Sequence, residues 1–362
     1  MKILVAPDSF KGSISAQSAA AAIAEGWQAI RPADNVRLFP QADGGEGTLD
    51  VVEASIPDST RRSVGAVHGP DGTPTSGEWL ALPDGTAVIE LAQMNGLPLL
   101  KELDPLGSST RGLGEVIAAA VRAGASSLVV ALGGSASTDG GVGALSALGM
   151  LFLGPGGQRL TEGGAALIDL SSVDSSRLLY PPVGGVTILS DVTAPLLGVN
   201  GAATIFGPQK GADPAQVELL ERGLHNLVAH LGGRPEVTGS GAAGGTAYGL
   251  STMWKVSTES GADYVRRITG LDDAIRDADL VITGEGQFDS QSLAGKVVGQ
   301  IIVKAAIAST PVAVIAGKLV GIPAVWATSL SERSGSARLS IADPVKWLTD
   351  AGKIAARELG TN

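Results

Sequence analysis

The sequence has no cysteine among its 362 residues, so the chain can form neither disulfides nor metal sites with thiolate ligands. It also lacks any run of about 18 apolar residues, which is the length that a membrane-spanning helix needs. The first apolar stretch meets Pro7-Asp8 too early to serve as a signal peptide. We therefore expect a soluble protein of the cytoplasm that has no membrane partner.

Positive charge is also scarce. The chain has 26 lysine and arginine residues against 36 aspartate and glutamate residues, a net charge of -10 and an isoelectric point near 4.8. Nucleic-acid binding needs clustered lysine and arginine, so we expect no nucleic-acid partner. An anionic ligand must then be held by a few local basic residues and by backbone N–H groups.

Glycine is abundant, with 51 residues in the chain, roughly double the ordinary share of about 7%. It follows no collagen-like period, and the excess lies in loops between strands and helices. The apolar fraction of 44% is that of a globular protein. A chain of 362 residues is long enough for about two domains.

The pattern of strands and helices predicts how these domains are arranged. Two strand–loop–helix units begin the chain, and the same rhythm returns after residue 271. We predict a flavodoxin-like, doubly wound parallel-sheet domain built from residues 1–60 and 271–362. An inserted mixed α/β domain would occupy residues 61–270 and begin with an antiparallel meander at two Pro-Asp-Gly turns. The active site is expected in the cleft between the domains.

The stretch from residue 279 to 317 is predicted to be a βαβ unit. A strand at 279–283 leads into the loop 284–289, Ser290 or Ser292 caps a helix with Lys296 in its first turns, and a second strand follows at 311–316. Further helices are expected at 15–30, 110–123, 214–231 and 344–359. The helix at 214–231 has the clearest signals, with Asp213 as its cap, Gln216 completing a capping box and Gly232 at its end.

Six acidic residues follow apolar strands or stand in glycine-rich loops: Asp8, Asp43, Asp139, Asp191, Glu285 and Asp289. Open α/β sheets bind ligands at the carboxyl ends of their strands, and carboxylate oxygens suit Mg²⁺. The alternative for any one of them is an ordinary helix or turn cap. We expect Glu285, Asp289 and Lys296 to face the same cleft as Asp8, Lys11 and Asp43.

Basic residues and glycines supply the candidate anion sites. Lys11, Lys210 and Lys296 stand next to glycine, where backbone N–H groups can also approach a phosphate or carboxylate, although each could be a solvated side chain. Arg111 could hold a carboxylate in a two-pronged contact or be solvated. The run GGSASTDGG at 133–141 and the glycines at 241–245 could wrap a nucleotide, or could serve only tight packing.

Six motifs in a fixed order give a resemblance to a known family. They read APDSFKG from residue 6, ADGGEGT from 42, GGSASTDGG from 133, SDVTAPL from 190, FGPQKGA from 206 and GEGQFDSQSLAGK from 284. The chain resembles the bacterial glycerate kinases whose sequence begins with an APDSFKG loop, and the likeness runs to about residue 318. The chain differs from the usual family pattern at Thr138 and Ala194, where most members have asparagine.

The resemblance implies ATP- and Mg²⁺-dependent phosphorylation of D-glycerate, in most members to 2-phosphoglycerate. We assign catalysis to Asp191, Asp43, Lys11 and Lys296, with Asp43 and Asp191 also as the magnesium ligands and either of them as the base. Substrate binding is assigned to Asp8, Ser9, Arg111, Lys210, Glu285 and Asp289. Nucleotide binding is assigned to Gly44, Gly45, Gly133, Gly134, Ser135 and Gly244.

Two other functions remain open at this point. Thr138 and Ala194 favour a non-catalytic regulator that binds a nucleotide or a small hydroxy acid on a kinase-like fold. The chain could also be a kinase for another small hydroxy acid. The sequence does not fix which hydroxyl is phosphorylated or the oligomeric state, for which a homodimer is one expectation.

Overall fold

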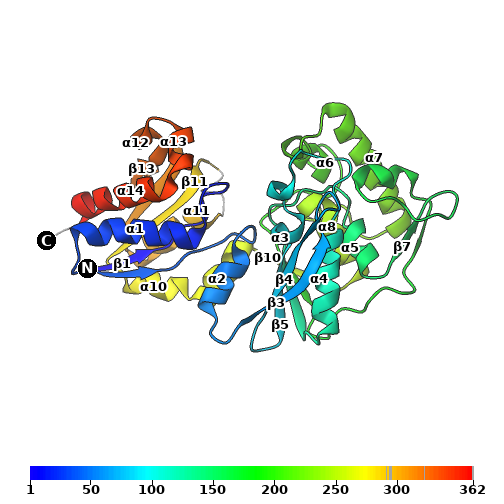
Figure 1. The fold of residues 1–362 in the computed structure, drawn as a ribbon, viewed down its shortest axis with the longest axis horizontal. Helices are drawn as coiled ribbons and strands as arrows, with labels where there is room; N and C mark the ends of the chain where they lie inside the picture. The colour runs from blue at the N-terminus through cyan, green and yellow to red at the C-terminus, as the bar shows by residue number, and fades with distance from the viewer. Residues whose placement is uncertain (291, 293–295, 322, 361–362) are drawn as a thin grey trace. The chain divides into compact units, whose positions relative to one another are not determined.

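The computed structural model describes residues 1–290, 292, 296–321 and 323–360 (Figure 1). The chain forms two compact units. The first unit contains Met1–Asp43, Asp50–Ile56 and Gly261–Asn362, and the second contains Gly44–Leu49 and Pro57–Ser260. Both ends of the sequence thus belong to the first unit. Helix α2 (Thr48–Ser55) begins in the second unit and continues into the first.

The first unit has a five-stranded parallel sheet. Its strands are β1 (Lys2–Val5), β2 (Asn35–Leu38), β11 (Leu280–Phe288), β12 (Val312–Leu319) and β13 (Trp326–Ser329), in the spatial order β13-β12-β11-β1-β2. Numbered along this unit alone, the order is 2-1-3-4-5, which is that of flavodoxin-like doubly wound sheets. The predicted fold class is confirmed for this part of the chain.

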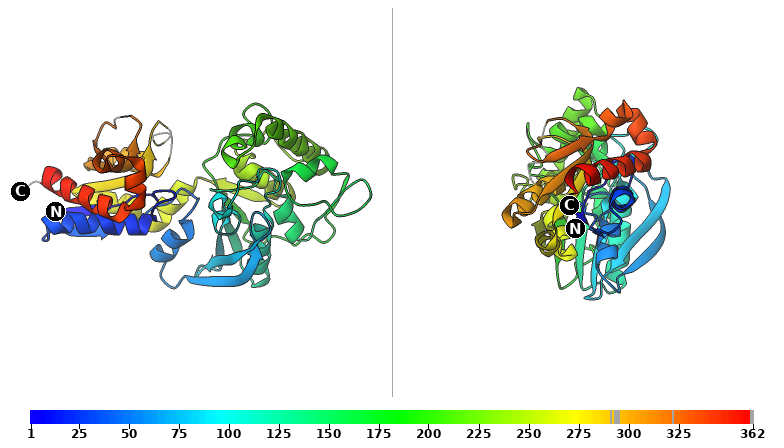
Figure 2. Two further views of the ribbon diagram at one scale, coloured as in Figure 1. Left: turned by 45° about the horizontal axis from the view of Figure 1, so that its top comes forward. Right: turned by 90° about the vertical axis from the view of Figure 1, so that its left-hand side faces the viewer.

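Helices cover both faces of this sheet because neighbouring strand residues point to opposite sides. Ile3 and Val5 pack on the side of α1 (Ala16–Ile30) and α14 (Pro344–Leu359). Leu4 packs on the side of α10 (Leu271–Asp277) and α11 (Val297–Ala308). Helices α1 and α14 lie side by side (Figures 1 and 2). Three further helices complete the unit: α9 (Gly261–Thr269), α12 (Leu330–Ser334) and α13 (Ala337–Ala342).

The βαβ unit at residues 279–317 is present, but two predicted boundaries are wrong. Strand β11 continues through the expected loop 284–289 as far as Phe288, because β12 runs beside it and Phe288 pairs with Leu319. Helix α11 begins at Val297, with Lys296 as its cap residue. Ser292 is not the cap of α11; its Oγ accepts a hydrogen bond from Asp289 N at 3.0 Å.

The second unit has a six-stranded mixed sheet. Its strands are β3 (Thr60–His68), β4 (Pro74–Ala81), β5 (Thr86–Glu90), β6 (Ser127–Ala131), β9 (Val186–Leu189) and β10 (Val256–Glu259), in the order β10-β9-β6-β5-β4-β3. The pairs β3–β4 and β4–β5 are antiparallel, which confirms the predicted meander, while the four strands from β5 to β10 are parallel. A separate hairpin joins β7 (Leu151–Leu153) and β8 (Ser172–Asp174).

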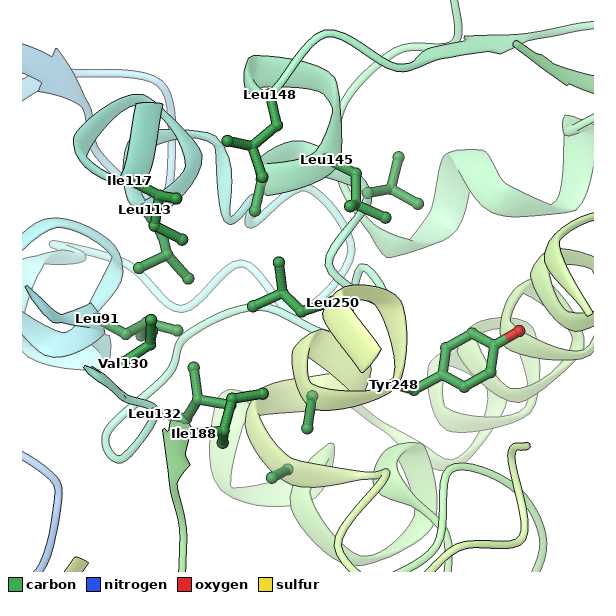
Figure 3. Packing of buried hydrophobic residues seen from close by; sticks show 14 of the residues in the cluster. Leu91, Leu113, Ile117, Val130, Leu132, Leu145, Leu148, Ile188, Tyr248 and Leu250 are labelled. Carbon is green, nitrogen blue, oxygen red and sulfur yellow. The ribbon is translucent and has the colours of Figure 1, made fainter. Parts of the chain in front are cut away.

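The helices of the second unit share one large apolar core with this sheet. They are α3 (Leu91–Asn95), α4 (Arg111–Arg122), α5 (Val142–Ala147), α6 (Ala202–Phe206), α7 (Pro214–Leu231) and α8 (Ala242–Met253), with short 3-10 turns η1 (Leu97–Leu99), η2 (Gly164–Asp169) and η3 (Pro208–Lys210). Figure 3 shows Leu113 and Ile117 of α4 near Val130 of β6, with Leu250 of α8 beside them.

The predicted helix at 214–231 is confirmed, together with the predicted capping box at its start and the predicted glycine, Gly232, at its end. Asp213 accepts from Gln216 N, and Gln216 Oε1 accepts from Asp213 N, which completes the capping box. Helix α8 occupies residues 242–249 of the glycine-rich stretch 239–249, although the backbone at Ala243, Gly244 and Gly245 is not helical. No helix among the described residues is long and apolar enough to cross a membrane.

Candidate active site

The carboxyl ends of neighbouring strands bring the predicted polar residues of the first unit together. Asp8 and its neighbours follow β1, Asp43 follows β2, and Glu285 lies in the last part of β11. Here the unit contains a cavity of about 420 Å³, which we call the acidic cavity. Seven of the predicted site residues line it: Asp8, Ser9, Lys11, Asp43, Glu285, Asp289 and Lys296.

Main-chain hydrogen bonds hold the loop after β1 against β11. Ala6 N donates to Ile282 O and Asp8 N donates to Gly284 O, both at 2.8 Å, so the parallel pairing continues past the end of β1. Gly284 is required here, since a Cβ on it would lie 2.0 Å from Ile315 O. The side chain of Asp8 is consequently fixed beside that of Glu285 at the wall of the cavity.

The acids of this cavity are held in an environment that disfavours their negative charge. Burial, together with the charges of Asp43 and Glu285, raises the pKa of Asp8 to about 8, although Lys11 opposes this shift. Burial also raises the pKa of Glu285, and the charges of Asp289 and Asp43 add to the effect. Such clusters of perturbed acids in a cavity are typical of functional sites.

The two lysines of the acidic cavity are placed differently. Lys11 Nζ lies 3.5 Å from Asp43 Oδ2, and its side chain is 58% exposed, so it can move towards an incoming anion. Lys296 stands at the first turn of α11, where the partial positive charge of the helix also favours an anion.

The second unit gathers the predicted nucleotide-binding glycines. Gly133, which follows β6, donates its N–H to Gly44 O at 3.0 Å, and a Cβ on Gly133 would lie 2.5 Å from Gly45 Cα. Gly134 has a φ of 78°, which few other residues adopt. Ser135 follows directly, and its Oγ accepts a hydrogen bond from Ser137 N at 3.2 Å. Five predicted glycine-loop residues therefore lie at one edge of this sheet.

Glu90, at the end of β5, is a residue that the sequence reasoning missed. It is 2% exposed, and its two carboxylate oxygens accept from Gly47 N at 3.1 Å and from Leu49 N at 2.9 Å. It thus fixes the ADGGEGT loop and the first turn of α2. The signal was present, since Glu90 follows an apolar strand like the other acids, but we interpreted that strand only as part of a meander.

Asp139 organises the loop at 133–141 from inside. It is fully buried and accepts hydrogen bonds from Thr110 N (2.9 Å), Thr110 Oγ1 (2.7 Å), Gly141 N (3.1 Å) and Gly143 N (3.1 Å). Burial raises its pKa against the effect of these bonds. Its carboxylate is therefore already bonded within the protein, and it is not an open metal ligand.

Lys210 is likewise inside the second unit. It is 3% exposed, its Nζ donates to Ser137 O, and burial lowers its pKa to about 8. In this structure the ammonium supports the loop at 133–141, and its assigned contact with substrate stays a prediction.

Gly244 belongs to a left-handed turn inside α8. Ala243, Gly244 and Gly245 have φ values of 51°, 62° and 91°. Gly244 O accepts from Gly140 N at 3.0 Å, and a Cβ on Gly244 would lie 2.1 Å from Ser137 O. This geometry is the tight packing that the sequence left open as an alternative, and the nucleotide role of Gly244 stays a prediction.

The last two predicted residues also lie in the second unit. The Arg111 guanidinium contacts Glu115 Oε1 at 3.2 Å and Glu162 Oε1 at 2.8 Å, so it is already paired with two carboxylates. Asp191 follows β9 and is exposed.

In the part of the chain that the structure describes, no group of three or more His, Asp or Glu side chains could hold a metal ion. Mg²⁺ often takes only one or two carboxylates plus substrate phosphates.

Comparison with known sequences decides the family. The sequence model of the glycerate kinase family matches residues 3–361. The chain belongs to the glycerate kinase family. The family expected from the motifs is confirmed, and the match continues well past residue 318, to which the likeness had been expected to run. The prediction that the chain is an enzyme is confirmed with it.

Individual members of the glycerate kinase family agree with this assignment. A glycerate kinase of Bacillus subtilis is 40% identical over 333 residues, which cover 88% of this chain and 85% of that protein. A glycerate 2-kinase of Escherichia coli is 40% identical over 309 residues, which cover 82% of this chain and 80% of that protein. A crystal structure of a candidate glycerate kinase 2 from Salmonella typhimurium LT2 superposes with a TM-score of 0.77 at 32% identity, covering 99% of this chain and 98% of that one.

Proposed function

We propose that this glycerate kinase family member transfers the γ-phosphoryl group of ATP to D-glycerate and produces 2-phosphoglycerate in the cytoplasm. The observation that carries the proposal is the acidic cavity, in which two lysines stand among four carboxyl groups at the carboxyl edge of a parallel sheet. Phosphoryl transfer depends mainly on positioning and on neutralising charge, and this combination supplies both.

The acceptor is assigned to the acidic cavity. Lys11 and Lys296 would meet the glycerate carboxylate and the transferring phosphoryl group, both of which are anions. Asp8, Ser9, Glu285 and Asp289 would meet the hydroxyl groups, which can donate to carboxylates.

The nucleotide is assigned to the glycine edge of the second unit. Gly44, Gly45, Gly133, Gly134 and Ser135 present main chain that a phosphate can approach closely, since four of these five residues have no side chain. Gly244 is also assigned to the nucleotide, and Arg111 and Lys210 are assigned to the substrate.

Magnesium is assigned to Asp43 and Asp191, and either carboxylate is proposed as the base that takes the acceptor's hydroxyl proton. The chemistry of the donors fits, because Mg²⁺ prefers carboxylate oxygens and the acidic cavity has more acids than lysines. When bound, the ion would neutralise charge on the phosphates. Asp43 borders the acidic cavity, and its loop is fixed by Glu90 through Gly47 and Leu49.

The test is a coupled assay of ADP release with D-glycerate, ATP and Mg²⁺, run on the natural chain and on Lys296→Met and Lys304→Met. Lys304 is the matched control, because it lies on α11, the helix that Lys296 caps, but does not line the acidic cavity. We expect kcat/KM to fall at least about a hundredfold for Lys296→Met and to change little for Lys304→Met.

Two outcomes would favour other functions. Thermal stabilisation by ATP or glycerate without any phosphorylated product would support a non-catalytic regulator. Faster turnover with another small hydroxy acid than with D-glycerate would support a kinase of different acceptor. The departure from the family pattern at Thr138 gives the regulator hypothesis little support, since this side chain is fully buried in the second unit.

A homodimer is proposed as the assembly. Light scattering of the protein as it elutes from a size-exclusion column would measure its mass.

A further inference from the structure

The second unit has a small pocket of its own, with a volume of about 240 Å³, which we call the α8 pocket. Its lining comes from the loop between α7 and α8, from α8 and from β10. Six residues of this lining define its chemistry: Val237, Thr238, Ala247, Tyr248, Ser251 and Thr258. None of the residues assigned to ATP, magnesium or glycerate is among the described residues that line it.

Little charge faces the α8 pocket. Arg234 is the one charged residue among its described lining, and its Nε already contacts Glu236 Oε1 at 3.2 Å. The Arg234 side chain is 78% exposed, so solvent screens its charge. Burial raises the pKa of Tyr248 to about 12, so its phenol stays neutral. A phosphate or a carboxylate needs close cations or several free N–H groups, and this pocket therefore favours an uncharged ligand.

The walls of the α8 pocket suit a flat ring with polar edges. Val237, Ala247 and Tyr248 supply apolar surface. In Figure 3 the ring of Tyr248 and the side chain of Leu250 extend from different sides of α8. The main chain of Thr238 makes no hydrogen bond to another described residue, so its N–H and its C=O are both open to a ligand. Nucleobases have apolar faces and carry donors and acceptors on their edges, which matches this combination.

Two hydroxyl groups of the α8 pocket are also open. Ser251 on α8 and Thr258 on β10 are exposed, and neither side chain is hydrogen-bonded to another described residue. Thr252 differs, since its Oγ1 donates to Tyr248 O at 2.8 Å. A hydroxyl both donates and accepts, so Ser251 and Thr258 can bind the hydroxyl groups of a ribose.

The α8 pocket lies near the glycine edge that is proposed to bind phosphate. Gly140 N, in the loop at 133–141, donates to Gly244 O at 3.0 Å, and Tyr248 stands about one helical turn further along α8. Strand β10 is two strands away from β6, which that loop follows. Neighbouring strands are about 4.8 Å apart, so roughly 10 Å separates the two places along the edge of the sheet. A ribose and its phosphates can bridge that separation.

We propose that the α8 pocket binds the base and ribose of ATP, so that the nucleotide lies along this edge of the sheet with its phosphates at Gly133, Gly134 and Ser135. This inference rests on the proposed function, because it takes ATP as the phosphoryl donor and the glycine edge as its phosphate site. Glycerate is a small anion, so the nucleoside is the part of the two substrates that suits an uncharged pocket. The α8 pocket then supplies affinity for the nucleotide and takes no part in the transfer.

The experiment fills the α8 pocket with a larger side chain from two separate elements. Ser251→Phe fills it from α8 and Thr258→Phe from β10, and both positions are exposed, so the core is left intact. The matched control is Ser257→Phe, since Ser257 is exposed on β10 but points to the other face of the sheet and does not line the pocket. We expect Tm to stay close to that of the natural chain in the two filled variants. In the control Tm should fall slightly, because the hydrogen bond between Ser257 Oγ and Thr187 Oγ1 is lost.

Binding is measured by calorimetry with three probes, which are ATP, adenosine and inorganic tripolyphosphate. We expect both filled variants to weaken adenosine and ATP at least about tenfold and tripolyphosphate by less than about twofold. In the coupled assay KM for ATP should rise by the same factor, while KM for D-glycerate and kcat at saturating ATP should stay within about twofold. Ser257→Phe should leave the affinity for all three probes unchanged.

Two results would overturn the inference. One is that adenosine and ATP bind both filled variants as well as they bind the natural chain. The other is an equal loss of affinity for adenosine and for tripolyphosphate, which would indicate a displaced loop. If one filled variant does not fold, the other decides, because the two changes lie on different elements.

The proposed function can fail separately. A natural chain that binds ATP and adenosine in the α8 pocket but phosphorylates no D-glycerate would refute that function alone. Turnover of D-glycerate with unchanged nucleotide affinity in both filled variants would refute the pocket assignment alone. A natural chain that binds neither ATP nor adenosine would refute both.

Discussion

Glu90 offers the sharpest test of how the ADGGEGT loop is held in place. In Glu90→Gln an NH₂ group replaces one of the two carboxylate oxygens, and an NH₂ group cannot accept a hydrogen bond. One of the two charge-assisted hydrogen bonds is therefore lost, and the main-chain N–H of Gly47 or of Leu49 is left without its partner beside a buried side chain. That change costs about 1–3 kcal/mol, and removing a negative charge at the first turn of α2 adds to it. We expect the free energy of unfolding in urea to fall by about 2 kcal/mol.

Activity should fall together with stability in this variant. The loop carries Asp43, Gly44 and Gly45, so loosening it displaces residues from both proposed ligand sites. Loss of a supporting partner behind a ligand-binding residue typically costs about tenfold to a hundredfold, and we expect kcat/KM to drop by that factor. Glu46→Gln is the control, because Glu46 is exposed on the same loop. Equal stability and equal kcat/KM for the two variants would refute the reasoning.

Two further predictions concern the stability of the first unit. Hydrogen bonds from the Met1 amino group, from Arg31 and from Trp27 outweigh the effect of burial and lower the pKa of Asp34 to about 2. Asp34→Asn should destabilise the protein by about 2 kcal/mol above pH 4, and urea titrations should show the difference vanishing as the pH falls through about 2. Gly26→Ala should cost about 1–3 kcal/mol, since its Cβ would lie 2.0 Å from Thr349 O between α1 and α14. Exposed Glu25→Ala is its control, and equal melting temperatures for the pair would contradict the close helix contact.

Elements with local signals could be predicted from the sequence. Helix α7 follows from Asp213, Gln216 and the terminal Gly232, which act within a few residues of one another. The parallel sheet of the first unit follows from the alternation of strands and helices, because parallel neighbours need crossover helices. The strand-end rule likewise selected Asp8, Asp43 and Glu285, which line one cavity in the structure.

Elements that depend on distant partners could not be predicted. Strand β11 continues through a Gly-Glu-Gly run that favours a loop locally, because β12 supplies hydrogen bonds as far as Leu319. The left-handed turn at Ala243 is stabilised by its packing against the loop at 133–141, which lies about a hundred residues earlier in the chain. The sequence also gives no sign that Lys210 and Asp139 are buried, since both stand beside glycines as exposed residues often do.

The central claim is that this chain phosphorylates D-glycerate. The most direct measurement is phosphorus NMR of a mixture of enzyme, ATP, Mg²⁺ and D-glycerate, followed until the ATP is consumed. We predict one new phosphomonoester, coupled to the proton on carbon 2, in an amount equal to the ADP formed. A spectrum with no phosphorylated glycerate, while the protein is folded and ATP is present, would contradict the claim.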